Sequence, residues 1–254
     1  MVYFLWMIFK HKEKFKPYIT VFNFRKVEKK ITNKLFNLGF PSALQMFFEV
    51  GIFTAAIWLS GVLGKNPQAA NQIALNLSSM TFMIGIGLSV AAMVRVGNQK
   101  GLNDFVSLRR IAFSIFFLTF LIEIIFASFF LVFRDWLPTL YLDQNTLVNI
   151  NDNKEVIIIA SKLLLVAAFF QIFDGLQVAI LGALRGLQDV KIPAFITFVS
   201  YWIIGFPVSY FLGLHTSLES IGIWIGLFTG LFAASILLYL RFNYLTKKLI
   251  SSKP

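Results

Sequence analysis

Six long apolar segments, separated by short polar stretches, dominate the pattern of hydrophobic and polar positions along the chain. A bilayer core of about 30 Å requires about 20 apolar residues in helical form, and each of the segments meets that length. Backbone polar groups in lipid must be bonded internally, and the segments lack the short alternating pattern of a barrel, so we expect helices. The expected spans are residues 36–63, 72–94, 111–133, 156–184, 192–212 and 220–240.

The composition indicates that lipid is the solvent for this chain. Hydrophobic residues make up 57% of it and charged residues 14%, whereas soluble domains contain about 45–50% apolar and about 25% charged residues. A soluble fold of this composition would leave a large apolar surface exposed. Cysteine is absent, and His11 and His215 alone are too few for a histidine zinc site. We expect an all-α membrane protein without a cofactor.

Lysine and arginine predict the orientation in the membrane. If both termini are cytoplasmic, the cytoplasmic segments hold 19 of the 23 basic residues, whereas the outer loops hold only Lys65, Arg134 and Lys154. These cytoplasmic segments are residues 10–35, 95–110, 185–191 and 241–254. The bias follows the positive-inside rule, so the net charge of +11 reflects orientation in the inner (cell) membrane and predicts no nucleic-acid partner.

The beginning of the chain is expected to differ from the rest. Residues 1–9 are apolar but too short to span, and we interpret them as the remnant of a preceding transmembrane helix. Residues 10–35 form a basic cytoplasmic loop, in which 18–35 has the pattern of an amphipathic helix at the inner leaflet; a solvated linker is the alternative. The six-helix transmembrane lobe occupies 36–245, and 246–254 form a cytoplasmic tail.

Two acidic side chains are predicted to reach similar depths in the membrane from different helices. An ionisable group at the bilayer centre costs about 2.5–3.5 kcal/mol on insertion scales and is therefore expected to have a function. Glu49 lies about 20 Å from the inner end of the first span, and Asp174 about 15 Å from the inner end of the fourth, by helical rise. Both carboxyl groups are thus expected near the midplane.

Polar side chains share helical faces with these carboxyl groups and form a third stripe in the second span. They are Ser42 and Gln45 with Glu49, Gln171 and Gln177 with Asp174, and Gln72, Asn76 and Ser79 in the second span. We expect these stripes to line one cavity, in which Glu49 and Asp174 bind Na⁺ through oxygen ligands or take up a proton. The alternative is that the carboxyl groups only form hydrogen bonds between helices.

Two further ionisable residues lie within the expected spans. Glu123 is surrounded in sequence by Phe, Leu and Ile, which favours a protonated glutamate bonded to a neighbouring helix over a functional group. Lys162 lies about 33 Å from the inner end of its helix and is expected to extend to the outer interface.

Helix-breaking and small residues predict local irregularities and close packing. Pro207 is expected to kink the fifth span, and Gly85 and Gly87 to loosen the second. Small residues repeat every four positions in the sixth span and predict a ridge for close helix packing. They are Gly222, Gly226, Gly230 and Ala234.

Three motifs in this order resemble the multidrug and toxin extrusion (MATE) family, particularly its NorM-like branch. The first is Leu38-Gly39-Phe40-Pro41 followed by Glu49. The second is Ala69-Ala70-Asn71-Gln72-Ile73-Ala74-Leu75, running to Arg95-Val96-Gly97. The third is Gln171-Ile172-Phe173-Asp174-Gly175-Leu176-Gln177, running to Gly182-Ala183-Leu184-Arg185-Gly186, Asp189 and Pro193. The likeness covers residues 30–245.

The resemblance implies a C-terminal half of a twelve-helix transporter, with the acidic pair of that lobe at Glu49 and Asp174. It implies cation-coupled (Na⁺ or H⁺) efflux of amphipathic cationic drug-like compounds and a missing N-terminal six-helix lobe as partner. Phe170 stands where some relatives have a tyrosine, and Asn71 where a histidine is common, which leaves the choice between Na⁺ and H⁺ open.

Three alternatives to this function remain from the sequence. A lipid-linked oligosaccharide flippase of the same superfamily would favour a basic groove at membrane depth, and the sequence shows no such cluster. An intramembrane enzyme could use Glu49 and Asp174 as acid and base, but no HExxH or GxSxG motif accompanies them. The third alternative is an inactive truncated product.

Overall fold

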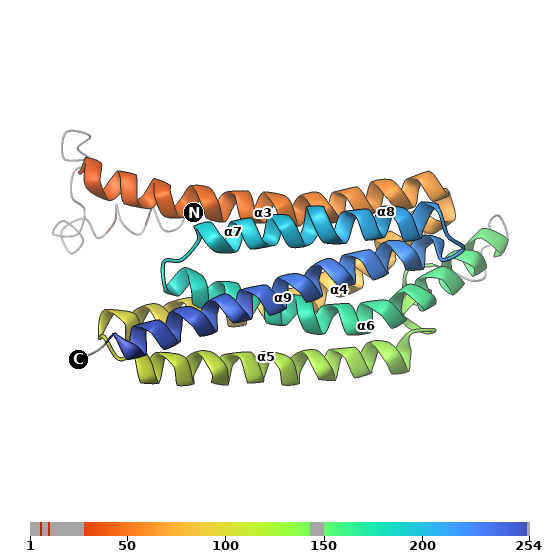
Figure 1. The fold of residues 1–254 in the computed structure, drawn as a ribbon. Helices are drawn as coiled ribbons and strands as arrows, with labels where there is room; N and C mark the ends of the chain where they lie inside the picture. The colour runs from red at the N-terminus through yellow and green to blue at the C-terminus, as the bar shows by residue number, and fades with distance from the viewer. Residues whose placement is uncertain (1–5, 7–9, 11–27, 143–149, 253–254) are drawn as a thin grey trace. The chain divides into compact units, whose positions relative to one another are not determined.

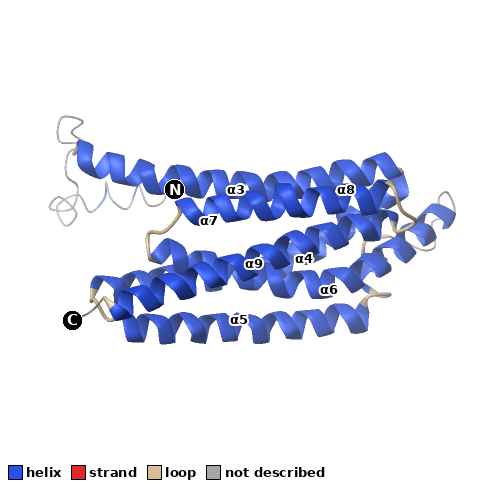
Figure 2. Ribbon diagram, viewed as in Figure 1, coloured by secondary structure: helices blue, strands red, loops and turns tan. Residues whose placement is uncertain are grey.

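The structure, a computed structural model, describes Trp6, Lys10 and residues 28–142 and 150–252, and the long elements in these ranges are helices (Figures 1 and 2). Six continuous helical segments, one of which consists of three consecutive elements, are long and apolar enough to cross a membrane. This confirms the predicted all-α class and the number of spans. The helices are α3 (Lys29–Leu63), α4 (Lys65–Gly101), α5 (Phe105–Phe133), α6 (Ile150–Gly186), α7 (Lys191–Phe198), the π-helix η3 (Val199–Gly205), α8 (Phe206–Leu214) and α9 (Glu219–Ser251), with a short 3₁₀ turn, η2 (Leu137–Leu140).

The chain divides at Phe40 into two units, and each is described by itself. In the first unit, α3 begins at Lys29, and the rings of Phe36 and Phe40 stack with centroids 5.7 Å apart. The predictions for residues 1–9 and for most of 10–35 lie outside the described residues and stay predictions. The second unit begins at Pro41 and contains the rest of α3 and all the later helices.

Close contact between α4 and α6 organises the second unit, and it depends on small residues. A Cβ atom added at Gly182 would lie 2.2 Å from the backbone oxygen of Ser89, and one at Gly186 would lie 2.6 Å from the backbone oxygen of Met93. The Ser89 hydroxyl donates a hydrogen bond of 2.7 Å to the backbone oxygen of Val178. The two backbones therefore approach each other more closely than larger side chains would allow.

The predicted ridge of small residues in the sixth span is confirmed. It faces α8, where a Cβ atom at Gly226 would lie 2.2 Å from the backbone nitrogen of Ser209. At Gly222 the nearest atom would be the backbone oxygen of Leu212, at 2.4 Å. The Ser209 hydroxyl also donates to the backbone oxygen of Ile223 at 2.9 Å, so α8 and α9 are joined by both packing and hydrogen bonding.

The fifth span is irregular at the predicted position. It consists of α7, η3 and α8, and Pro207 is at the start of α8, directly after the π-helical turn. Proline lacks a backbone N–H and its ring clashes with the carbonyl four residues earlier, so the hydrogen-bond pattern changes before it. In contrast, α4 stays one α-helix through Gly85 and Gly87, so the expected loosening of the second span does not interrupt it.

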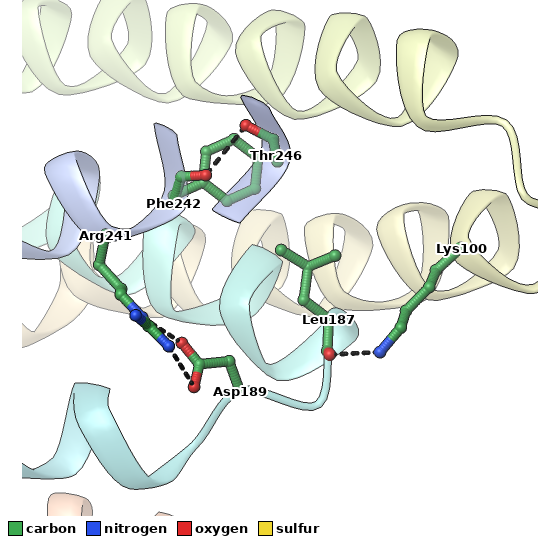
Figure 3. Close-up of polar contacts among 6 residues, drawn as sticks. All are labelled: Lys100, Leu187, Asp189, Arg241, Phe242 and Thr246. Carbon is green, nitrogen blue, oxygen red and sulfur yellow. Dashed lines mark hydrogen bonds and ion pairs between the residues drawn. The ribbon is translucent and has the colours of Figure 1, made fainter. Parts of the chain in front are cut away.

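The connection between α6 and α7 is fixed by two polar contacts (Figure 3). Arg241 on α9 donates to both carboxylate oxygens of Asp189, at 2.8 and 3.4 Å, and Lys100 at the end of α4 donates to the backbone oxygen of Leu187 at 2.5 Å. Gln188, between the two anchored residues, turns the chain with a φ of 59°. The connection thus ties α4, α6 and α9 together at one end of the lobe.

Candidate functional site

The two predicted carboxyl groups are both buried inside the second unit. Glu49 on α3 is 9% exposed and Asp174 on α6 is 6% exposed. The two carboxyl groups are close enough to interact electrostatically, and their common depth in the membrane stays a prediction. The Oδ1 atom of Asp174 is buried and has no hydrogen-bond partner among the described residues.

A basic residue, Arg185 on α6, also lies near Glu49. The Arg185 guanidinium donates a hydrogen bond of 3.1 Å to the side-chain oxygen of Gln45, one turn before Glu49 on α3. It also interacts electrostatically with Glu49. Sequence reasoning assigned Arg185 to the cytoplasmic end of its helix as part of a motif and missed this contact, because the reach of a long side chain depends on which helix packs beside it.

Asp174 faces a cavity of about 320 Å³ between α3, α4 and α6. Two of the predicted polar lining residues, Gln72 and Asn76, line it from α4. The remaining lining residues are Phe53, Ile57, Leu75, Ser78, Ser79, Phe82 and Phe170. The cavity therefore combines one carboxyl group, several neutral oxygen-bearing side chains and an aromatic wall.

The other two predicted lining residues lie away from this cavity. Gln45 is 2% exposed and is held by Arg185, as described above. Gln171 is 3% exposed, and its side-chain oxygen lies 3.0 Å from the Thr81 hydroxyl on α4. The prediction that all the polar stripes line one cavity is therefore wrong for Gln45 and Gln171, because each is bonded to a neighbouring helix. It is also wrong for Glu49, Ser42 and Gln177, which do not line this cavity.

Asn71 and Phe170, the two positions that the sequence resemblance marks as unusual, are connected in space through Trp224. The side-chain oxygen of Asn71 accepts a hydrogen bond of 2.9 Å from the indole N–H of Trp224 on α9. Trp224 is fully buried and lies 5.3 Å from the Phe170 ring, measured between centroids. Phe170 in turn lines the cavity. The substitutions therefore form part of the packed wall behind the cavity.

Tyr201 is a further polar residue near the two carboxyl groups that sequence reasoning missed. It lies on η3, is 1% exposed, and interacts electrostatically with both Glu49 and Asp174. Its side chain is adjacent to Gln177 of α6. The available sequence signal was a phenol within an apolar span, six residues before Pro207.

Within the described ranges, no three His, Asp or Glu side chains cluster as ligands for a metal ion. The site instead contains two carboxyl groups and neutral oxygens. Such a set can bind a monovalent cation or a proton, whereas sites for divalent cations usually concentrate several carboxylates. Since an organic cation is also attracted to a buried carboxylate, the same group can serve two kinds of cation in turn.

Six helical segments that are long and apolar enough to cross a membrane, together with two buried carboxyl groups, define a polytopic membrane protein. The MatE family matches residues 41–211, and the chain belongs to this family. Multidrug resistance protein MdtK of Yersinia pseudotuberculosis (serotype O:1b, strain IP 31758) is 39% identical over 222 residues, which cover 86% of this chain and 47% of the relative. MdtK of Yersinia enterocolitica (serotype O:8 / biotype 1B) is 38% identical over the same share of both chains.

Solved structures show the same fold. The eukaryotic MATE transporter AtDTX14 aligns with a TM-score of 0.74 at 24% identity and covers 85% of this chain and 48% of its own. A MATE structure in the bent conformation aligns with a TM-score of 0.80 at 16% identity, over 92% of this chain and 50% of its own. The chain thus spans about half the length of the relatives it matches.

Proposed function

We propose that this chain forms one six-helix lobe of a cation-coupled multidrug efflux antiporter. The observation that carries the proposal is the buried pair of Glu49 and Asp174, brought together from α3 and α6, with Asp174 facing the cavity. The coupled cation, Na⁺ or H⁺, moves into the cell while an amphipathic cationic compound moves out. The names of the MdtK relatives, which describe multidrug resistance, support this assignment.

The mechanism is competition for the same negative charge. An organic cation held in the cavity faces the Asp174 carboxyl group and the rings of Phe53 and Phe170. A proton or Na⁺ bound at Asp174 and Glu49 removes that attraction and releases the organic cation. Because such coupling is reciprocal, the organic cation lowers the affinity of the site for the coupling ion by the same factor.

The membrane arrangement of the active transporter belongs to the same proposal. A second six-helix lobe completes the substrate path, in keeping with a chain that spans about half of its relatives. The lobe lies in the inner membrane with both termini cytoplasmic, because 19 of 23 basic residues then fall on the cytoplasmic side.

The test is ethidium efflux from a drug-sensitive bacterial strain that expresses this chain with the first six helices of an MdtK relative. Glu49→Gln and Asp174→Asn should each abolish efflux while leaving membrane insertion intact. Glu219→Gln is the matched control, because this carboxyl group is exposed at the start of α9. Efflux that survives both substitutions would show that the acidic pair has only a structural role.

A further inference from the structure

A third intramembrane carboxyl group, Glu123 on α5, lies outside the cavity and outside the proposed exchange of cations. It is 1% exposed, and neither of its carboxyl oxygens has a hydrogen-bond partner among the described residues. This contradicts the expectation of a glutamate bonded to a neighbouring helix. A buried carboxyl group without a partner requires an explanation, because an ionised one in this environment is strongly disfavoured.

Two glycines create the space that Glu123 occupies. A Cβ atom at Gly175 of α6 would lie 2.4 Å from Oε1 of Glu123, and one at Gly85 of α4 would lie 3.6 Å from the same atom. At this level the two helices are also close to each other, with the Cα of Gly175 3.5 Å from the position of a Cβ on Gly85. The carboxyl group of α5 thus lies in a slot formed by the backbones of α4 and α6.

The slot places Glu123 next to the proposed cation site. Gly175 directly follows Asp174 on α6, and the carboxyl groups of Glu123 and Asp174 interact electrostatically. Asp174 faces the cavity on one side of α6, and Glu123 reaches the backbone of the same turn from α5. A change of charge at one carboxyl group therefore alters the proton affinity of the other.

The other ionisable groups of the packed helices are more distant. On α4 the nearest is Arg95, ten residues from Gly85, and on α6 Arg185 is ten residues from Gly175. On α9, Tyr239 contacts Phe113, which is ten residues from Glu123 on α5. Ten residues correspond to about 15 Å along a helix, so among the ionisable groups named on these packed helices Asp174 is the nearest to Glu123.

The chemistry of the slot selects the ligand. A hard metal cation requires several oxygen ligands, and no side chain of the described residues forms a hydrogen bond with the Glu123 carboxyl group. A proton requires only the carboxyl group itself. We propose that Glu123 is a second proton-binding site of this lobe, which exchanges its proton in response to the charge on Asp174.

The proposal that Glu123 binds a proton is argued only from the geometry of the slot. The proposal that this proton responds to the charge on Asp174 rests on the function proposed above. The two are separated by infrared spectroscopy of the purified full chain over a range of pH, in the carbonyl-stretch region of protonated carboxylic acids. Glu123→Gln should remove one band that wild type shows near neutral pH. That band should weaken as the pH is raised, while the protein is still folded by circular dichroism. Glu219→Gln should leave the spectrum of this region unchanged.

Asp174→Asn tests the coupling. In this variant the Glu123 band should disappear at a lower pH than in wild type, since a neighbouring negative charge has been removed. An identical spectrum for wild type and Glu123→Gln would overturn the proposal, and so would a Glu123 band that persists until the protein unfolds. A pH-dependent Glu123 band whose pH range is the same in Asp174→Asn would support the proton site and contradict its coupling to Asp174.

The failure of the proposed function gives a different result. In that case the Glu123 band and its pH dependence stay as in wild type, while Asp174→Asn and Glu49→Gln leave efflux unchanged.

Discussion

The guanidinium of Arg185 donates a hydrogen bond of 3.1 Å to the side-chain oxygen of Gln45, and this bond joins the C-terminal end of α6 to α3. The same guanidinium interacts electrostatically with Glu49, one turn further along α3. The lobe therefore has a positive charge of its own beside one of the two proposed cation ligands. Any cation that binds at Glu49 does so in the presence of this charge.

Removing this charge should strengthen cation binding. Arg185→Gln is expected to raise the affinity of the site for the coupling cation on the order of tenfold, which corresponds to about 1.4 kcal/mol. Arg185→Lys keeps the charge, and Gln45→Ala removes the hydrogen bond alone, so both should stay near wild type. The measurement is the concentration of Na⁺ or H⁺ that displaces bound ethidium. Equal effects of Arg185→Gln and Gln45→Ala would assign the contact a purely structural role.

The slot around Glu123 predicts a double-mutant cycle. Gly175→Ala should destabilise the chain by about 1–3 kcal/mol, because the added methyl group would overlap the Glu123 carboxyl group. In a Glu123→Ala background the same substitution should cost less, by about 0.5–3 kcal/mol, since the space has been vacated. Thermal unfolding of the four proteins in detergent measures this. Additive effects would mean that the two side chains do not share the space.

The α8–α9 contact should be sensitive to a single methyl group. Gly226→Ala is expected to cost about 1–3 kcal/mol, because its Cβ would lie 2.2 Å from the backbone nitrogen of Ser209. Gly87→Ala is the matched control, since nothing lies within 4 Å of that position. In the middle of α4 it should instead stabilise the helix by up to about 1 kcal/mol. Similar melting temperatures for the two variants would contradict the packing described.

The hydrogen bond between Trp224 and Asn71 is predicted to hold the wall behind the cavity. Trp224→Phe removes the indole donor and should cost about 1–3 kcal/mol, because the buried Asn71 oxygen then loses its partner. Trp58→Phe serves as control, since Trp58 is 63% exposed. Thermal unfolding again provides the readout. A loss in Trp58→Phe as large as that in Trp224→Phe would show that the bond contributes nothing specific.

The sequence predicts the spans and the acidic pair because both follow from one-dimensional quantities. The length of an apolar segment identifies a span, and helical rise converts the positions of Glu49 and Asp174 into similar depths. Pro207 predicts an irregular turn in the fifth span because proline cannot donate a backbone hydrogen bond. These features require no knowledge of which helices are neighbours.

The sequence predictions that are wrong concern side chains whose position depends on which helices pack beside them. Gln171 shares a face with Asp174, yet Thr81 on α4 holds it away from the cavity. Arg185 reaches Gln45 because α3 lies beside the end of α6. Glu123 occupies a slot that exists only because Gly85 and Gly175 meet in register. Pairing and register of helices are properties of the packed structure, and hydropathy alone does not encode them.

The central claim is that Glu49 and Asp174 together form a cation-binding site, and proton release from the purified chain tests it most directly. Ethidium or Na⁺ is added in weak buffer over a range of pH, and a pH indicator reports the protons displaced. Wild type and Glu219→Gln should release protons to the same extent, whereas Glu49→Gln and Asp174→Asn should each release clearly fewer. Equal release from all four proteins would contradict the account, because the added cation would then bind elsewhere.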